Sequence, residues 1–225
     1  MRIELCGPMG VGKTTLAKRL SSLTGWRLLQ EPVETHPFLK PFYESPSSYA
    51  FEKNLFFLMD YMHQIKLCES DNMVFDHSAV VHRSYAALNR LLPAEKPVFQ
   101  ALDRVIERLG PPDLLINLVC PPDLIIERIR RRGREFESGV DIGYIIALNE
   151  EVQRQVAAVE HYIPVMHVDA ETHDFEKNPR DILNAYRQIK QKIGYTQDTL
   201  SAEAALAEAA MASAESALTS LAVAV

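Results

Sequence analysis

The segment that most constrains this chain runs from Gly7 to Thr15 and reads Gly-Pro-Met-Gly-Val-Gly-Lys-Thr-Thr. It contains the complete pattern Gly-x-x-x-x-Gly-Lys-Thr, which is typical of a phosphate-binding loop. A short apolar run, 2–6, precedes it, and leucines at helical spacing follow it. The pattern therefore lies between an expected strand and an expected helix, which is the context that such a loop requires.

The expected chemistry of this loop follows from its backbone. Glycines let the chain curl so that its N–H groups converge on phosphate oxygens, and the N-terminus of the next helix adds partial positive charge. We expect Lys13 to reach the outer phosphates of ATP and the Thr14 hydroxyl to ligate Mg²⁺. The alternative is a chance match in a glycine-containing turn. The other nucleotide-binding positions expected in the loop are Gly7, Gly10, Val11, Gly12 and Thr15.

Size and charge favour one domain and a small-molecule ligand. A chain of 225 residues that is 47% hydrophobic can bury one sizeable core. The formal net charge of −6 argues against nucleic acid as the main partner. Much of that charge lies in the C-terminal segment, where Asp198, Glu203, Glu208 and Glu215 occur without Lys or Arg.

The cysteines and the hydropathy pattern predict a cytoplasmic protein without a membrane anchor. Cys6, Cys68 and Cys120 are far apart and lack metal-ligand spacing, which suits free thiols in a reducing compartment. The chain opens directly on the expected strand, which leaves no room for a signal peptide. We find no apolar run close to the ~20 residues that a membrane span needs.

Apolar patterns predict an α/β fold of strands alternating with helices, which implies a parallel sheet with helices on both faces. A further helix over 47–70 has its apolar face at Phe51, Leu55, Leu58, Met62 and Ile65. The expected strands are 2–6, 26–30, 73–76, 114–119 and 165–168. The other expected helices are one after the phosphate loop, one that extends through Leu92, one over 95–109, one that starts near Pro122, one over 142–159 and one over 181–193.

The domain is expected to span 1–195, and the chain changes character after it. Residues 196–225 are rich in alanine, with scattered Ser, Glu and Leu. Alanine favours helix, but so few large apolar residues can bury little surface. We expect a mobile or loosely docked helix there, and an amphipathic helix that binds a partner is the alternative.

Two acidic residues follow expected strands directly. Glu31 comes after the second strand and Asp76 after the third. Ligands collect at the carboxyl ends of parallel strands, so both should lie near the phosphate loop. We interpret Glu31 as the general base that accepts a proton from an attacking hydroxyl, and Asp76 as a residue on the Mg²⁺ side. For each, the simpler alternative is an ordinary helix-capping acid.

A basic run ends the helix that starts near Pro122. Arg128 and Arg132 lie four residues apart on one helical face, and Gly133 allows a turn before Arg134. Guanidinium groups suit phosphate, so we predict an arginine-rich lid that closes over the transferring phosphates and excludes water. The alternative is a solvated helix end.

These motifs together resemble deoxynucleoside kinases of the bacterial deoxyadenosine/deoxyguanosine type, from Met1 to about Ile193. The resemblance rests on the phosphate loop and on four further segments, Glu31-Pro32-Val33-Glu34, Pro37-Phe38-Leu39 with Phe42-Tyr43, Tyr49-Ala50-Phe51, and Arg128 to Glu137. It implies a P-loop kinase fold with a five-stranded parallel sheet. It also implies a homodimer that moves the γ-phosphate of ATP to the 5′-hydroxyl of a nucleoside.

The resemblance also implies roles for individual residues. Glu31 matches the base, and Tyr43 and Glu137 match the groups that hold the sugar 3′-hydroxyl. Arg128, Arg132 and Arg134 match the lid. The loop along the ATP adenine matches Thr172, His173, Asp174 and Phe175.

The sequence departs from the family pattern in the acceptor pocket. His77 stands where the family has an arginine near the 5′-hydroxyl, His82 replaces the base-reading aspartate, Ala86 replaces a base-stacking phenylalanine, and Asn54 replaces the base-binding glutamine. Arg83 is on a different helical face from His77 and is no obvious substitute. The pocket has either drifted or been rebuilt around another acceptor, in which case Asn54, His77 and His82 contact that acceptor.

Three functions are consistent with these observations. The first is an ATP:nucleoside phosphotransferase with an altered acceptor. A nucleoside monophosphate kinase shares the loop and lid but needs extra cations for the acceptor phosphate. A nucleotide-binding regulatory protein descended from a kinase would show little catalysis.

Overall fold

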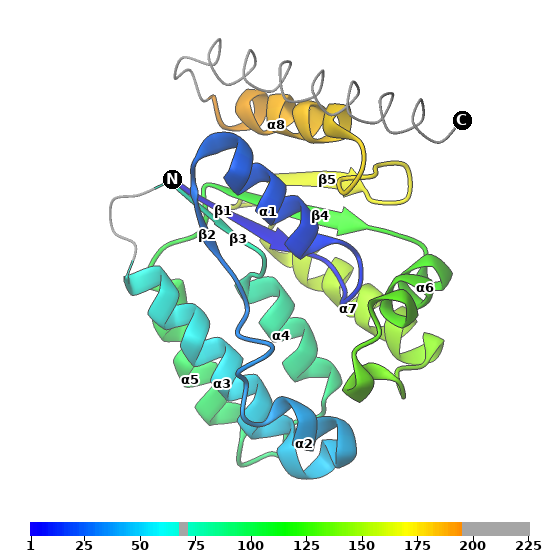
Figure 1. Cartoon of the computed structure of the whole chain (residues 1–225). Helices are drawn as coiled ribbons and strands as arrows, with labels where there is room; N and C mark the ends of the chain where they lie inside the picture. Colours follow the sequence, from blue (N-terminus) through cyan, green and yellow to red (C-terminus); the bar gives the residue numbers. More distant parts are fainter. Residues whose placement is uncertain (68–71, 195–225) are drawn as a thin grey trace, which may run out of the picture.

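A computed structural model describes residues 1–67 and 72–194 of the chain, and these form an α/β fold around one parallel sheet (Figure 1). The five strands lie in the order β2-β3-β1-β4-β5 and all neighbouring pairs are parallel, which confirms the predicted sheet. The strands are β1 (Arg2–Cys6), β2 (Arg27–Leu29), β3 (Met73–Phe75), β4 (Leu114–Val119) and β5 (Val165–Asp169). Cys68 and the predicted helix in 196–225 lie outside the described residues.

The strand β1 lies at the centre of the sheet, and its residues from Ile3 to Cys6 are buried. It pairs with β3, where Ile3 is level with Val74, and with β4, where Leu5 is level with Ile116. All four of these side chains are fully buried. A strand covered on both faces must be apolar along most of its length. This is why the strand β4 could be predicted from the apolar run 114–119.

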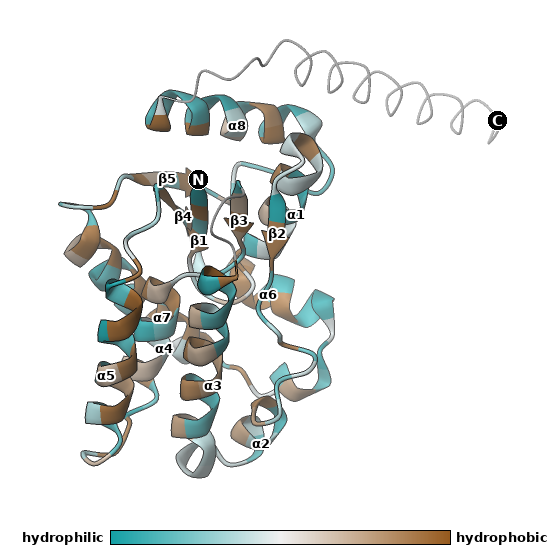
Figure 2. Ribbon diagram, turned by 90° about the vertical axis from the view of Figure 1, so that its left-hand side faces the viewer, coloured by the Kyte–Doolittle hydropathy of each residue, from teal (hydrophilic) through white to brown (hydrophobic). Residues whose placement is uncertain are grey.

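Helices cover both faces of the sheet (Figures 1 and 2). In Figure 2 the helices carry both hydropathy colours, as expected of elements with one apolar face. On one face lie α1 (Lys13–Thr24) and α8 (Pro179–Ile193), and on the other lie α3 (Pro46–Lys66), α4 (Ala79–Leu88), α5 (Lys96–Glu107) and α7 (Ile142–Val159). The basic helix α6 (Pro122–Arg132) packs against α7 and the phosphate loop.

The buried face of α3 differs from the predicted one. The helix ends at Lys66, and Leu67 lies in a turn, so the prediction that the helix continues through Leu67 is wrong. The rest of the predicted extension, 68–70, lies outside the described residues. Leu58 and Ile65 of the predicted stripe are buried, but Phe51, Leu55 and Met62 are only partly buried. The helix packs against α2 (Leu39–Glu44), α4 and α5, and polar side chains share its inner face. The buried residues are Ala50, Lys53, Asn54, Phe57, Leu58, Tyr61 and Ile65.

Two short elements escaped the sequence analysis. The helix α2 (Leu39–Glu44) forms in a stretch that reads as irregular because of its prolines, and the 3₁₀ helix η1 (Glu135–Glu137) follows α6. Pro41 is tolerated because it lies in the first turn of α2, where backbone N–H groups have no partner within the helix. Packing of Leu39 and Phe42 against α3 stabilises α2, and that contact is not visible in the local pattern. The second strand is also shorter at each end than the predicted 26–30.

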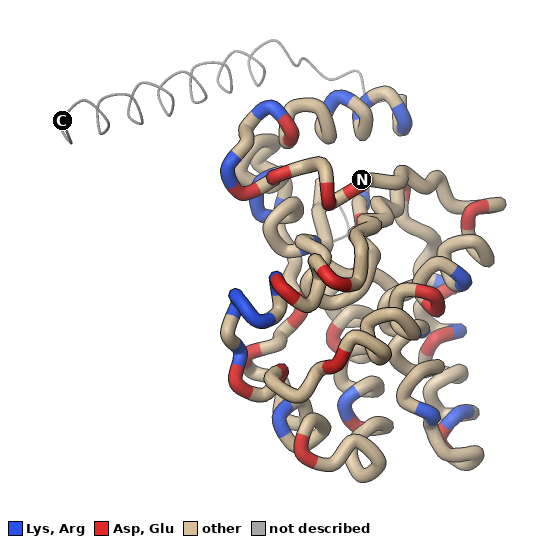
Figure 3. Tube along the Cα trace, turned by 90° about the vertical axis from the view of Figure 1, so that its right-hand side faces the viewer, with Lys and Arg blue, Asp and Glu red and all other residues tan. Residues whose placement is uncertain are grey.

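The surface carries charges of both signs. Basic and acidic residues are both spread over the described trace (Figure 3). None of the helices in residues 1–67 and 72–194 is long and apolar enough to cross a membrane.

Candidate active site

The carboxyl ends of the strands surround a cavity of about 1190 Å³. Its walls come from the phosphate loop after β1, the segment after β2, Asp76 after β3, the arginine-rich end of α6 and the loop after β5. The convergence predicted for Glu31, Asp76 and the phosphate loop is therefore present. Most predicted site residues line this cavity: Gly10, Val11, Gly12, Lys13, Thr14, Thr15, Glu31, Tyr43, Asn54, Asp76, His82, Arg128, Arg132, Arg134, Glu137, His173, Asp174 and Phe175. Gly7, His77 and Thr172 lie behind it and contact residues of the wall.

The phosphate loop has the shape that an anion cradle requires. Gly7 has φ 133° and Gly12 has φ 114°, in the region that residues with a Cβ rarely adopt. A Cβ on Gly7 would also lie 2.7 Å from the carbonyl oxygen of Leu118. Gly12 caps α1, so the N-terminus of that helix opens into the cavity.

Lys13 is a buried cation held by backbone oxygens. Its Nζ donates to the carbonyls of Gly7 at 2.9 Å and Pro8 at 3.0 Å. Burial lowers the pKa of Lys13, and the nearby charges of Glu31 and Asp76 oppose that shift. Among the described residues no carboxylate lies within 4.0 Å of Nζ. A desolvated charge without a direct carboxylate partner fits a polyphosphate in the loop.

Asp76 connects the phosphate loop with Glu31. Its Oδ2 accepts a 2.9 Å hydrogen bond from Thr14 Oγ1, and its Oδ1 accepts one of 2.9 Å from the backbone N–H of Glu31. A hydroxyl and a carboxylate side by side next to a phosphate site are the oxygen ligands that Mg²⁺ prefers. The donor set therefore fits the predicted metal position at Thr14 and Asp76.

Glu31 has the environment of a group that can exchange a proton near neutral pH. Its side chain is 21% exposed, and it lies on the cavity wall. Burial raises the pKa of Glu31 to about 7, with a further contribution from the negative charge of Asp76. Lys13, Lys53 and Arg134 limit the shift.

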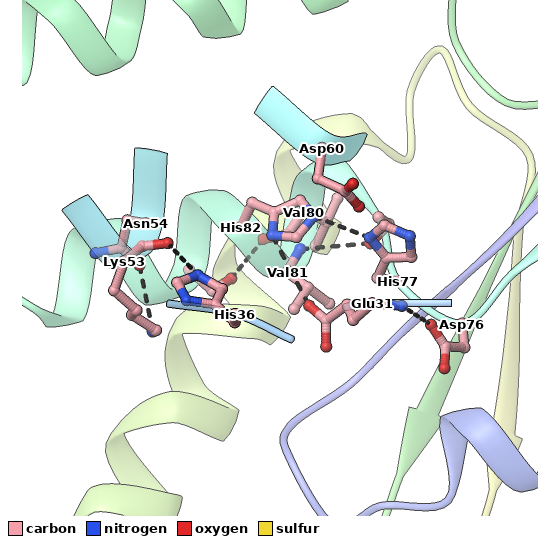
Figure 4. Close-up of polar contacts among 12 residues, drawn as sticks. Glu31, His36, Lys53, Asn54, Asp60, Asp76, His77, Val80, Val81 and His82 are labelled. Carbon is pink, nitrogen blue, oxygen red and sulfur yellow. Dashed lines mark hydrogen bonds and ion pairs between the residues drawn. The ribbon is translucent and has the colours of Figure 1, made fainter. Parts of the chain in front are cut away.

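His77 and His82 form a buried pair next to Glu31 (Figure 4). His77 Nδ1 lies 3.1 Å from His82 Nε2, and His82 Nδ1 lies 4.0 Å from Glu31 Oε1. Burial lowers the pKa of His77 to about 4 and that of His82 well below its usual value, so both rings are neutral at pH 7. The pair therefore supplies no fixed positive charge at the position of the family arginine.

Hydrogen bonds around Gln64 determine the tautomers of this pair. Gln64 Nε2 donates to the carbonyl of Gln30 at 3.0 Å and to Asp60 Oδ2 at 2.6 Å, so its Oε1 is the acceptor 3.2 Å from His77 Nε2. His77 thus carries its proton on Nε2, and its Nδ1 accepts from His82 Nε2–H. The Nδ1 lone pair of His82 then faces the Glu31 carboxylate.

The sequence analysis missed Lys53, whose side chain is only 4% exposed and lines the cavity. Its Nζ lies 4.7 Å from the ring centre of Phe42, 4.3 Å from that of Tyr85 and 5.9 Å from that of Phe57. Burial lowers the pKa of Lys53 to about 7, and Glu31 opposes the shift. The sequence signal for a buried lysine was its position three residues after Ala50, on a helix face that is otherwise mainly apolar.

Asn54 is bound into the protein rather than left free. Its Nδ2 donates to the carbonyl of Ala50 at 2.7 Å, and its Oδ1 accepts from Lys53 Nζ and from Asn89 Nδ2, each at 3.3 Å. Both ends of the amide are therefore engaged without a ligand. Arg83, in contrast, points away from the cavity to Asp103 at 2.9 Å and Glu107 at 3.0 Å on α5, which agrees with its predicted position.

The arginines of the predicted lid have distinct partners. Arg128 donates to the carbonyls of Val11 at 3.0 Å and Ala170 at 2.7 Å, and thus joins the phosphate loop to the loop after β5. Arg132 pairs with Glu137, and Arg134 lies 3.4 Å from Glu137. The guanidinium groups therefore lie along one side of the cavity.

Glu137 and Tyr43 lie next to these arginines on the cavity wall. Glu137 is buried between its two arginine partners. Burial, reinforced by the charge of Glu137, raises the pKa of the Tyr43 phenol, and the Tyr43 ring contacts Phe136 with centroids 5.4 Å apart. In the loop after β5, Phe175 is buried and stacks on His173, while Thr172 bonds to His173 at 3.1 Å.

Comparison with known proteins extends over most of the chain. Residues 3–193 match the family model described as deoxynucleoside kinase. A deoxyguanosine kinase from Lactobacillus johnsonii is 30% identical over 210 residues, which is 85% of this chain and 92% of that protein. A deoxyguanosine kinase from Bacillus subtilis is 27% identical over 203 residues, covering 85% of this chain and 97% of its own length.

A solved structure agrees in fold. The deoxyadenosine kinase from M. mycoides with bound dCTP superimposes with a TM-score of 0.72 at 23% identity, over 85% of this chain and all of that one. The predicted P-loop kinase fold is confirmed by this similarity and by the sheet topology. Because the family model matches residues 3–193 of this chain, the chain belongs to the deoxynucleoside kinase family.

Proposed function

We propose that this protein transfers the γ-phosphate of ATP to the 5′-hydroxyl of a deoxynucleoside, with Glu31 as the general base. The observation that carries the proposal is the position of Glu31 on the cavity wall, joined through Asp76 to the phosphate loop. A base with a pKa of about 7 is half deprotonated at neutral pH and can take the hydroxyl proton as the new P–O bond forms.

Basic side chains of this protein bind the phosphates of ATP and stabilise the transferring phosphoryl group. Lys13 and the N–H groups around Gly12 bind the phosphates of ATP, and Arg132 and Arg134 stabilise the charge that develops on the transferring group. Arg128 holds the phosphate loop against the loop after β5, where His173 and Phe175 form a surface for the adenine. Thr14 and Asp76 would hold Mg²⁺, which neutralises phosphate charge when it is bound.

The acceptor end is proposed to read the base through Lys53. In its ammonium form this side chain has only donors, and Asn54 is already engaged with Ala50 and Asn89. A buried donor favours a base that presents acceptors, such as the O6 and N7 atoms of a 6-oxopurine. The names of the two deoxyguanosine kinase relatives agree with that choice. Tyr43 and Glu137 are proposed to bind the 3′-hydroxyl.

Two further properties are proposed. Exposed apolar residues on α5, among them Val98 and Val105, support a homodimer. Most of the apolar stripe of α3, in contrast, packs inside the protomer. Cys6 and Cys120 are buried free thiols, which supports a cytoplasmic location.

The test is a coupled assay of ADP release with purified protein, ATP and Mg²⁺ across the deoxynucleosides and their monophosphates. We expect turnover with nucleosides, and most with deoxyguanosine or deoxyinosine. Turnover with monophosphates alone would favour a monophosphate kinase. ADP release with none of them would favour the regulatory protein.

A further inference from the structure

Glu31, His77 and His82 form a cluster that transfer of a phosphate to a hydroxyl does not by itself require. One carboxylate oxygen and one nitrogen of each ring all lie within 4.8 Å of one another. Figure 4 shows the three side chains turned toward one another, at the start of α4 and in the segment after β2. Two neutral imidazoles and one carboxylate are the ligand types of many zinc sites.

The separation of the two rings suits a shared ion. Metal–nitrogen distances of about 2.0–2.1 Å in a tetrahedral site place two nitrogen ligands about 3.3 Å apart. His77 Nδ1 and His82 Nε2 are 3.1 Å apart in the structure. A metal ion can therefore replace the hydrogen bond between the rings with little change in their separation.

Hydrogen bonds through Gln64 hold His77 in the tautomer that a metal ligand needs. Its Nε2–H donates to Gln64 Oε1 at 3.2 Å, and Gln64 is itself oriented by Asp60 and the carbonyl of Gln30. Ligating histidines commonly donate their second N–H in this way, which fixes the tautomer that leaves the other nitrogen free for metal. When His82 ligates through Nε2, its single proton moves to Nδ1, which faces the Glu31 carboxylate.

We propose that Glu31, His77 and His82 bind one transition-metal ion of the zinc class, and that this ion inhibits the kinase by occupying the Glu31 carboxylate. The inhibition rests on the proposed role of Glu31 as base, whereas the binding does not. The site differs in chemistry from the pair of Thr14 and Asp76, which offers oxygen ligands alone. Nitrogen ligands favour Zn²⁺, Co²⁺ and Ni²⁺ over Mg²⁺.

Binding is tested on the full chain without any turnover. Zn²⁺ is titrated by calorimetry, and Co²⁺ by its visible absorption, both in millimolar Mg²⁺. We expect one equivalent to bind, and His77→Gln and His82→Asn each to weaken binding more than tenfold. Gln64→Leu keeps both histidines but removes the hydrogen bond to His77, together with those from Gln64 to Asp60 and Gln30, and should weaken binding about 10- to 100-fold. His161→Gln, at an exposed histidine, is the matched control and should bind as the wild type does.

Inhibition is tested separately, at saturating ATP and Mg²⁺. Zn²⁺ should lower wild-type turnover, while each histidine variant keeps more of its own zinc-free rate. Wild type that binds Zn²⁺ at the three residues but keeps full turnover would refute the inhibitory role and leave the binding site standing. A protein inactive on every acceptor would speak against the proposed function without touching the binding result.

Crystals of the wild-type protein soaked in Zn²⁺ cover the case in which a buried histidine variant fails to fold. An anomalous difference peak between Glu31, His77 and His82 is the expected result. The site proposal is overturned if the peak is absent there, or if folded His77 and His82 variants bind Zn²⁺ with wild-type affinity.

Discussion

Thr14 donates a 2.9 Å hydrogen bond from Oγ1 to Oδ2 of Asp76, although the two residues are 62 positions apart in the chain. This contact joins the N-terminus of α1 to the carboxyl end of β3, and it places the predicted metal position at the edge of the cavity. The second oxygen of Asp76 holds the backbone of Glu31. Phosphate loop, metal position and proposed base are thus parts of one hydrogen-bonded unit.

Lys13→Ala should abolish the thermal stabilisation that ATP provides, because the substitution removes the cation expected to contact the outer phosphates. Thermal unfolding with and without ATP and Mg²⁺ measures this, and wild-type stabilisation should shrink when EDTA is added. Lys192→Ala, at an exposed lysine on α8, is the control and should respond as the wild type does. Undiminished stabilisation of the Lys13 variant would exclude the proposed nucleotide site.

Glu31→Gln keeps the shape of the side chain but cannot accept a proton. We expect turnover to fall by about 10²- to 10⁴-fold while stabilisation by ATP remains. Glu150→Gln, on the exposed face of α7, should leave turnover unchanged.

The pH dependence of the wild type supports or contradicts the same assignment. The folded pKa of Glu31 is raised to about 7, so the base is protonated below that pH and the rate with limiting acceptor should rise from pH 6 to pH 8. The Gln variant should lose this rise. Unchanged turnover in Glu31→Gln would remove the residue from the mechanism.

Lys53→Met should stabilise the protein and weaken discrimination between bases. Burial lowers the pKa of Lys53 in the folded protein to about 7. The buried charge therefore lowers the free energy of unfolding by its full amount below pH 7, and this cost declines as the pH rises toward the pKa of Lys53 in the unfolded chain. We expect a gain of about 2 kcal/mol in unfolding free energy at pH 6, and less at pH 9. Chemical denaturation at both pH values measures this, with exposed Lys66→Met as the control.

The same variant tests base recognition in the kinase assay. The preference for deoxyguanosine over deoxyadenosine should fall by about tenfold or more, as expected for loss of a hydrogen bond from a charged donor. Retention of the full preference would mean that another group reads the base.

Glu137→Gln should impair recognition of the 3′-hydroxyl. The charged carboxylate lies between Arg132 and Arg134 and next to Tyr43. The wild type should prefer a 2′-deoxynucleoside over its 2′,3′-dideoxy analogue, and the variant should lose about 10-fold or more of that ratio in kcat/KM. Equal losses on both substrates would instead indicate a structural role for Glu137 in holding the arginines.

The wild-type protein should be a homodimer in solution, at twice the 25.4 kDa of one chain. Light scattering at micromolar concentration measures the mass. Val105→Glu places a charge on the exposed apolar face of α5 and should shift the mass to that of the monomer. Lys96→Glu, at the exposed start of the same helix, should not. A monomeric wild type would contradict the prediction.

The sequence by itself determined the fold class, the phosphate loop and the family. The strands β1 and β4 are short, mainly apolar runs, and the pattern from Gly7 to Thr14 depends only on neighbouring residues, so the local sequence is sufficient to identify them. The convergence of Glu31 and Asp76 was also predictable, because parallel strands bring their carboxyl ends to one edge.

The tertiary structure alone decided how the acceptor pocket is built. Lys53 reads as a solvated lysine in sequence, but α2 and α4 bury it among Phe42, Tyr85 and Phe57. His77 and His82 are separated by five positions, and only the packing of α3 against α4 brings Gln64 to fix their tautomers. Segments far apart in the chain bury these side chains and supply their hydrogen-bond partners. Burial and partners determine whether each side chain is charged and where its proton lies, and residue identity alone does not specify this.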